Sequence, residues 1–150
     1  MDDELIAELV VFGPRSDRAA AALGQAGDPA AIPYLLTALR RDAGWEDRSA
    51  ACCKAAAIAA IGGDVAVDVL VGQLEALDDA ALVDDAGDMG DEYWRIRSAV
   101  VHGLGLLGAV AEPRLLRALG HPNPDARDWA ATALEAIGRP HAADSQLSEE

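Results

Sequence analysis

The chain has 150 residues, of which 51% are hydrophobic but only 4% aromatic, and its formal net charge is −14. So acidic a surface repels nucleic-acid phosphates and anionic membranes, and neither is expected as a partner. No apolar run approaches the ~20 residues of a membrane span, and the acidic start Met1–Gly13 lacks the basic region of a secretory signal. We therefore expect a cytoplasmic protein.

The residue pattern predicts an all-α chain, because alanine, leucine, arginine and glutamate favour helix and no stretch alternates β-branched with polar residues. A first helix before Gly13-Pro14, with Leu5 and Leu9 on one side, would cap the open end of the fold at residues 1–14. Further helices are expected at about 16–23, capped by Ser16 or Asp17, and at about 28–41, 46–61, 64–77, 92–107, 111–119 and 125–137. The remaining segments are predicted to be a loop at Asp42–Trp45, an acidic insertion at 78–91 and a flexible tail at 139–150.

The same short pattern recurs along the chain. ALGQAG at 22–27, AIAAIG at 57–62, GLGLLG at 103–108 and EAIG at 135–138 each end a predicted helix at a glycine. In the helix that follows, Leu35 recurs as Leu70 and Leu115, while Leu36 and Leu39 recur as Val71 and Leu74, then as Leu116 and Leu119. Self-similarity at a spacing of 30–50 residues indicates a stack of helical repeats.

The segments DPAAIPYLLTAL (28–39) and HPNPDARDWAATALEAIG (121–138) resemble HEAT-like repeats of the phycobilisome-lyase type. The resemblance covers about residues 15–138. It implies an α-solenoid of three to four repeats and seven or eight helices, wound into a right-handed superhelix and forming one domain over residues 1–138. Repeats of this kind occur in scaffolds, regulators and a few enzymes, so the resemblance implies a fold more than an activity.

A partner-binding groove is predicted on the second helix of each repeat. With the leucines of 28–41 turned inward, Tyr34, Thr37 and Arg41 lie on the opposite side, and second helices usually line the concave surface of such a stack. With their repeat equivalents, the predicted groove consists of Tyr34, Thr37, Arg41, Val69, Gly72, Arg114, Arg117 and His121. Its arginines and Tyr34 would be polar anchors over a floor of Val69 and Gly72. A solvated face whose arginines pair with nearby acids explains the pattern equally well.

The three tryptophans are expected near the boundaries between repeats. Trp45 and Trp94 hold equivalent positions at the starts of first helices, where they would pack between consecutive repeats or, in the alternative, contact a partner. Trp129 lies near the C-terminal end of the stack, where it would contact a second copy if the protein dimerises.

No residue pattern indicates a metal, a cofactor or a catalytic group. A calcium loop starting at Asp84 would place Ala86 at its third position and Met89 where glycine is required, so the acidic insertion fails that pattern. His102, His121 and His141 have no metal-ligand spacing, and no nucleophile lies beside a base.

These observations favour a non-catalytic scaffold or adaptor that binds a protein or peptide, as a monomer or a weak homodimer. Two alternatives remain. The acidic surface would suit an inhibitor or immunity-like protein that masks a basic enzyme, although acidity also serves solubility alone. The resemblance would also suit a subunit of a chromophore lyase.

Overall fold

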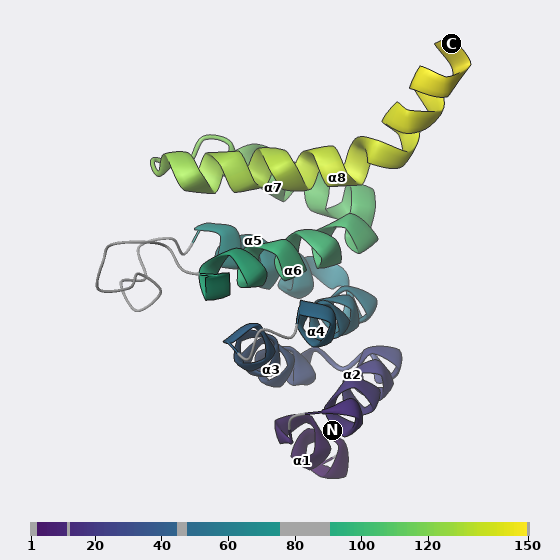
Figure 1. Cartoon of the computed structure of the whole chain (residues 1–150), viewed down its shortest axis with the longest axis vertical. Helices are drawn as coiled ribbons and strands as arrows, with labels where there is room; N and C mark the ends of the chain where they lie inside the picture. The colour runs from purple at the N-terminus through teal and green to yellow at the C-terminus, as the bar shows by residue number, and fades with distance from the viewer. Residues whose placement is uncertain (1–2, 12, 45–47, 76–90, 150) are drawn as a thin grey trace.

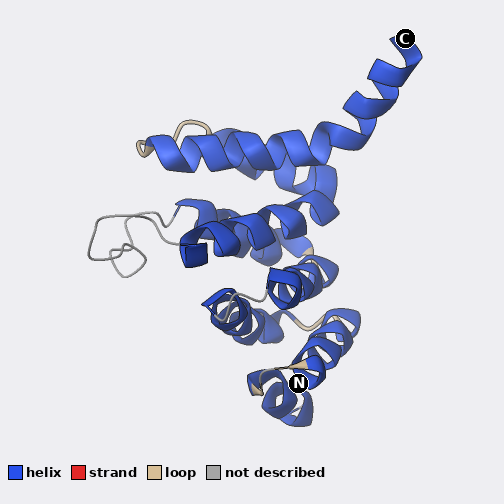
Figure 2. Ribbon diagram, viewed as in Figure 1, coloured by secondary structure: helices blue, strands red, loops and turns tan. Residues whose placement is uncertain are grey.

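A computed structural model describes residues 3–11, 13–44, 48–75 and 91–149 of the chain. The α-helices are α1 (Asp3–Val10), α2 (Pro14–Ala26), α3 (Ile32–Gly44), α4 (Arg48–Ile61), α5 (Gly63–Glu75), α6 (Asp91–Leu107), α7 (Glu112–Ala118) and α8 (Pro124–Glu149). Two short 3-10 helices, η1 (Pro29–Ala31) and η3 (Gly108–Ala111), precede α3 and α7. Within these ranges there is no strand (Figure 2), so the predicted all-α solenoid is confirmed.

The helices lie in pairs stacked along the long axis of the molecule (Figure 1): α1 with α2, α3 with α4, α5 with α6, and α7 with α8. Successive pairs are joined mainly through the first helices of the repeats, since α2 packs on α4, α4 on α6 and α6 on α8. The second helices α3, α5 and α7 form the other layer, and α1 closes the N-terminal end against α2 and α3.

The core follows the repeat pattern in the sequence. Leu35, Leu70 and Leu115, which hold the same position in three repeats, are all 0% exposed. The last repeat differs at two neighbouring positions, because Leu116 is 52% and Leu119 38% exposed. The short helix α7 is the last second helix of the described residues.

Small residues let the first helices approach one another closely. A Cβ added at Gly24 of α2 would lie 3.1 Å from the Cα of Ala57 in α4, and one at Gly103 of α6 would lie 3.0 Å from the carbonyl oxygen of Ala55. A larger side chain at either contact would push the helices apart. The alanine-rich composition therefore reflects short distances between first helices.

Three expected boundaries differ in the structure. Helix α2 starts at Pro14, with Gly13 as its N-cap, so Ser16 and Asp17 lie inside the helix rather than capping it. Helix α3 continues through the expected loop to Gly44, which places Asp42 in its last turn. Helix α8 runs past the expected end at Gly138 to Glu149, and its last turns bend away from the stack (Figure 1). The predicted insertion at 78–91 lies outside the described residues, apart from Asp91.

One segment, Arg95–Ala118, is long and apolar enough to cross a membrane by length and composition, contrary to our expectation from the sequence. In the structure it is divided between α6 and α7, with a break at Gly108, whose φ is 65°. Leu104 and Leu115 from its two halves lie in the hydrophobic core. Other apolar residues of the segment, Leu106, Val110 and Leu116, are exposed, so the segment is only partly buried within the stack.

Candidate binding surface on the second helices

We call the outer side of α3, α5 and α7 the second-helix face; it carries the predicted groove residues. Tyr34 and Thr37 on α3 are exposed, as is Arg117 on α7. On α5, Val69 is partly buried against the core, and a Cβ added at Gly72 would meet no atom within 4 Å. These observations place the predicted side chains on accessible helix surface but do not by themselves make a groove.

The first hollow on this face, pocket 1, lies between α1 and α3 and has a volume of about 460 Å³. Three predicted residues, Tyr34, Thr37 and Arg41, line it together with Ala38 of α3. Leu9 and Val10 form the opposite wall, contributed by α1. Three residues predicted for the groove thus lie on the α3 side of this pocket, and the α1 side was not predicted.

The side chain of Arg41 joins α1 to the rest of the stack by hydrogen bonds. Its Nη1 donates to the carbonyl oxygens of Leu9 (2.9 Å) and Val10 (2.7 Å), at the C-terminal end of α1. Its Nη2 donates to Ser16 Oγ (3.0 Å) and Asp42 Oδ1 (2.8 Å), and its Nε donates to the same carboxylate oxygen (3.1 Å). The last carbonyls of a helix lack intrahelical donors and carry partial negative charge, so the guanidinium caps α1.

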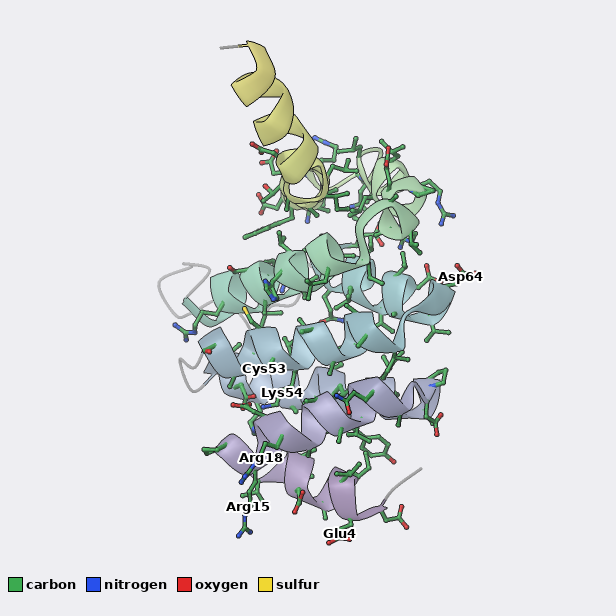
Figure 3. All side chains as sticks on the ribbon, turned by 90° about the vertical axis from the view of Figure 1, so that its right-hand side faces the viewer. Glu4, Arg15, Arg18, Cys53, Lys54 and Asp64 are labelled. Carbon is green, nitrogen blue, oxygen red and sulfur yellow. The ribbon has the colours of Figure 1, made fainter. Side chains whose placement is uncertain are left out.

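Arg41 belongs to a partly buried ion cluster that also contains Asp17, Asp42 and Lys54. Lys54 of α4, labelled in Figure 3, is the only lysine of the chain. Its side chain is 0% exposed. Its Nζ lies 2.6 Å from Asp17 Oδ1 and 2.7 Å from Asp42 Oδ2. Asp42 therefore joins Lys54 to Arg41, and the cluster ties α2, α3 and α4 together. Sequence analysis missed it; a lone lysine within an alanine-rich helix was the available signal.

The second hollow, pocket 2, lies between α5 and α7 and has a volume of about 290 Å³. It is lined by Asp64, Val67, Asp68, Val110, Pro113, Arg114 and Arg117. Arg114 is engaged within the protein: its Nη2 lies 2.5 Å from Glu75 Oε1, its Nη1 3.2 Å from Glu75 Oε2, and its Nε 3.3 Å from Asp68 Oδ1. Of the two predicted arginines, Arg117 is the more available to a partner.

The Arg114–Glu75 pair changes both ionisation equilibria. The hydrogen bond from Arg114 holds the pKa of Glu75 below its usual value, against an opposing effect of burial. The same hydrogen bond raises the pKa of Arg114. A charge-assisted, two-pronged pair of this kind favours the ionised forms of both groups.

We expect Glu75→Gln to lower the free energy of unfolding at neutral pH and to have a smaller effect in acid. Because the folded-state pKa of Glu75 is depressed, its stabilising contribution is present above its unfolded pKa and disappears as the pH falls through the folded value. Denaturant unfolding at about pH 7 should show a loss of about 0.5–1 kcal/mol that shrinks at about pH 3. Glu135→Gln, at an exposed acid of α8, is the control. A Glu75→Gln loss that is the same at both pH values would contradict the expectation.

The remaining predicted residues lie apart from these pockets. Val69 and Gly72, the expected floor, line neither pocket 1 nor pocket 2, and His121 accepts a hydrogen bond at Nδ1 from the backbone of Asn123 (3.1 Å). Trp129 packs partly buried against the core. Trp45 and the side chain of Trp94 are outside the described residues. The two pockets share no lining residue, so this face presents two hollows where one groove was expected.

Comparison with known families matches two parts of the chain. Residues 85–145, which include α6, α7 and most of α8, match a family model described as HEAT repeats. Residues 17–41, from α2 into α3, match one described as PBS lyase HEAT-like repeat. No curated protein matches the chain.

Proposed function

This chain is a HEAT-repeat protein that includes a PBS lyase HEAT-like repeat, and on that premise we propose that it is a non-catalytic module that binds a protein or peptide on its second-helix face. Stacked helical repeats present extended surfaces to partners, and families of HEAT repeats are generally scaffolds. We further propose that the module acts in the cytoplasm.

The observation that carries the proposal is pocket 1. Three residues selected from the sequence as partner contacts, Tyr34, Thr37 and Arg41, line the same hollow. Its volume of about 460 Å³ falls within the range of about 300–1,000 Å³ typical of ligand pockets. An accessible tyrosine at such a hollow is also the kind of residue that interfaces favour.

A pocket-filling variant tests the proposal. We expect Thr37→Trp to lose a partner that the unaltered protein captures from its native host, because the indole would occupy pocket 1. The matched control is Thr132→Trp on α8: both threonines are exposed, and each donates to the carbonyl four residues earlier, Thr37 to Pro33 (3.0 Å) and Thr132 to Asp128 (2.9 Å). Calorimetry with the purified partner should give a loss of affinity of at least about tenfold, or about 1.4 kcal/mol, for Thr37→Trp alone. Equal affinities for the two variants would remove pocket 1 from the proposal.

The match to a PBS lyase HEAT-like repeat supports a second candidate, a subunit of a chromophore lyase. It covers residues 17–41, one repeat of the stack, and so supports a shared repeat more directly than a shared reaction. A visible absorption spectrum of the protein purified from its native host separates the candidates, since a lyase subunit carrying its pigment would be coloured.

A further inference from the structure

The walls of pocket 1 are largely hydrocarbon. Leu9 and Val10 contribute aliphatic side chains from α1, and Ala38 contributes a methyl group from α3. At the rim, Val10 is 67% and Tyr34 46% exposed. Apolar surface of this kind gains free energy when a partner removes it from water.

Among the described residues that line pocket 1, Arg41 is the charged one, and its N–H groups are engaged within the protein. A guanidinium has five N–H groups, and five hydrogen bonds to protein acceptors engage them: two to backbone carbonyls of α1, two to Asp42 and one to Ser16. Ser16 gives its own hydroxyl proton to the Leu9 carbonyl at 2.8 Å and so accepts from Arg41. An acidic ligand would have to displace these bonds.

The charge of Arg41 and the hydroxyl of Thr37 are also satisfied within the protein. Asp42, whose side chain is fully buried, lies against the Arg41 guanidinium and offsets its charge. The Thr37 hydroxyl donates to the carbonyl of Pro33 within α3. The described lining of pocket 1 therefore offers a ligand hydrocarbon walls, the ring and hydroxyl of Tyr34, and no uncompensated charge. A ligand group that complements such a pocket is itself uncharged, because a buried charge without a partner is costly.

We infer that pocket 1 takes an uncharged, bulky apolar side chain of the partner, of the size of leucine, phenylalanine or tryptophan, and does not recognise a carboxylate. This inference rests on the proposed function and narrows its partner to segments that carry an apolar anchor. It assigns Arg41 to building the pocket, in place of the anchoring role expected from the sequence. A single large side chain that fills a central hollow often provides most of the affinity of an interface.

Two small probes test the inference on the whole chain by backbone amide NMR: N-acetyl-tryptophanamide and N-acetyl-glutamate. The tryptophan probe should shift the amides of Tyr34, Thr37 and Ala38 in a saturable manner, with a dissociation constant in the millimolar range expected for so small a ligand. Raising NaCl from about 0.05 to 0.5 M should change that constant less than about twofold, because screening acts on charges. Thr37→Trp should abolish the shifts, and Thr132→Trp should keep them.

The outcomes separate this inference from the proposed function. Saturable, salt-insensitive shifts by the tryptophan probe alone support it. Shifts of the same amides by the glutamate probe, weakened by salt, would overturn the inference and leave the proposed binding surface intact. If neither probe shifts these amides while Thr37→Trp still loses the captured partner, the inferred apolar anchor is contradicted and the proposed binding surface is retained. If neither probe shifts these amides and Thr37→Trp still captures the partner, pocket 1 is removed from the proposed function and from this inference.

Discussion

Lys54→Ala should lower the free energy of unfolding by about 3–5 kcal/mol, the largest effect we expect from a single substitution in this chain. Lys54 is fully buried, and its ammonium lies within 2.7 Å of both Asp17 and Asp42. Its removal leaves Asp42, also fully buried, with a charge that Arg41 alone must compensate, and it leaves a cavity in α4. Urea unfolding followed by circular dichroism measures the loss.

Two further variants distinguish charge from volume. Lys54→Met keeps most of the side-chain volume and removes the charge. It should regain the part of the free energy of unfolding that Lys54→Ala loses through the cavity, but not the part lost through the unpaired carboxylate. Arg18→Ala removes an exposed cation from α2 (Figure 3) and should change stability by less than about 0.5 kcal/mol. If Lys54→Met were as stable as the unaltered protein, the ion cluster would contribute nothing beyond packing, contrary to our expectation.

The repeat core could be predicted because its signal is local and periodic. Leu35, Leu70 and Leu115 recur at one position in successive second helices, and a helix of 3.6 residues per turn directs that position inward each time. The helix ends could be predicted from local signals too. Gly27, Gly62 and Gly108 each end one of the recurring sequence segments, and each has the positive φ that is common at the end of a helix. Gly138 follows the same sequence pattern, but α8 continues through it.

The ion cluster could not be predicted because its members are distant in sequence. Lys54 meets Asp17 across 37 residues, and Arg41 meets the Val10 carbonyl across 31. The helical pattern places Arg41 correctly beside Tyr34 and Thr37, yet it contains no information on which acceptors another helix brings to that arginine. The same absence of long-range information explains why one groove was expected where the structure has two separate hollows, one between α1 and α3 and one between α5 and α7.

Arg41→Ala is expected to detach α1 while the rest of the stack stays folded. An isolated helix of eight residues is unstable in water, so α1 depends on its contacts with α2 and α3. Loss of the guanidinium removes two hydrogen bonds to α1 carbonyls and one partner of buried Asp42, for a cost of about 2–3 kcal/mol. Hydrogen exchange should therefore accelerate first in the amides of α1.

Arg40→Ala is the matched control, since Arg40 is the preceding residue of α3 and its Nη1 bonds to Gln73 of α5 (2.9 Å), away from α1. It should leave the exchange of α1 unchanged. Because Leu9 and Val10 form one wall of pocket 1, detachment of α1 in Arg41→Ala should also abolish the shifts caused by N-acetyl-tryptophanamide. Persistence of those shifts together with rapid exchange in α1 would show that α3 alone binds the probe, and α1 would then be only an end cap.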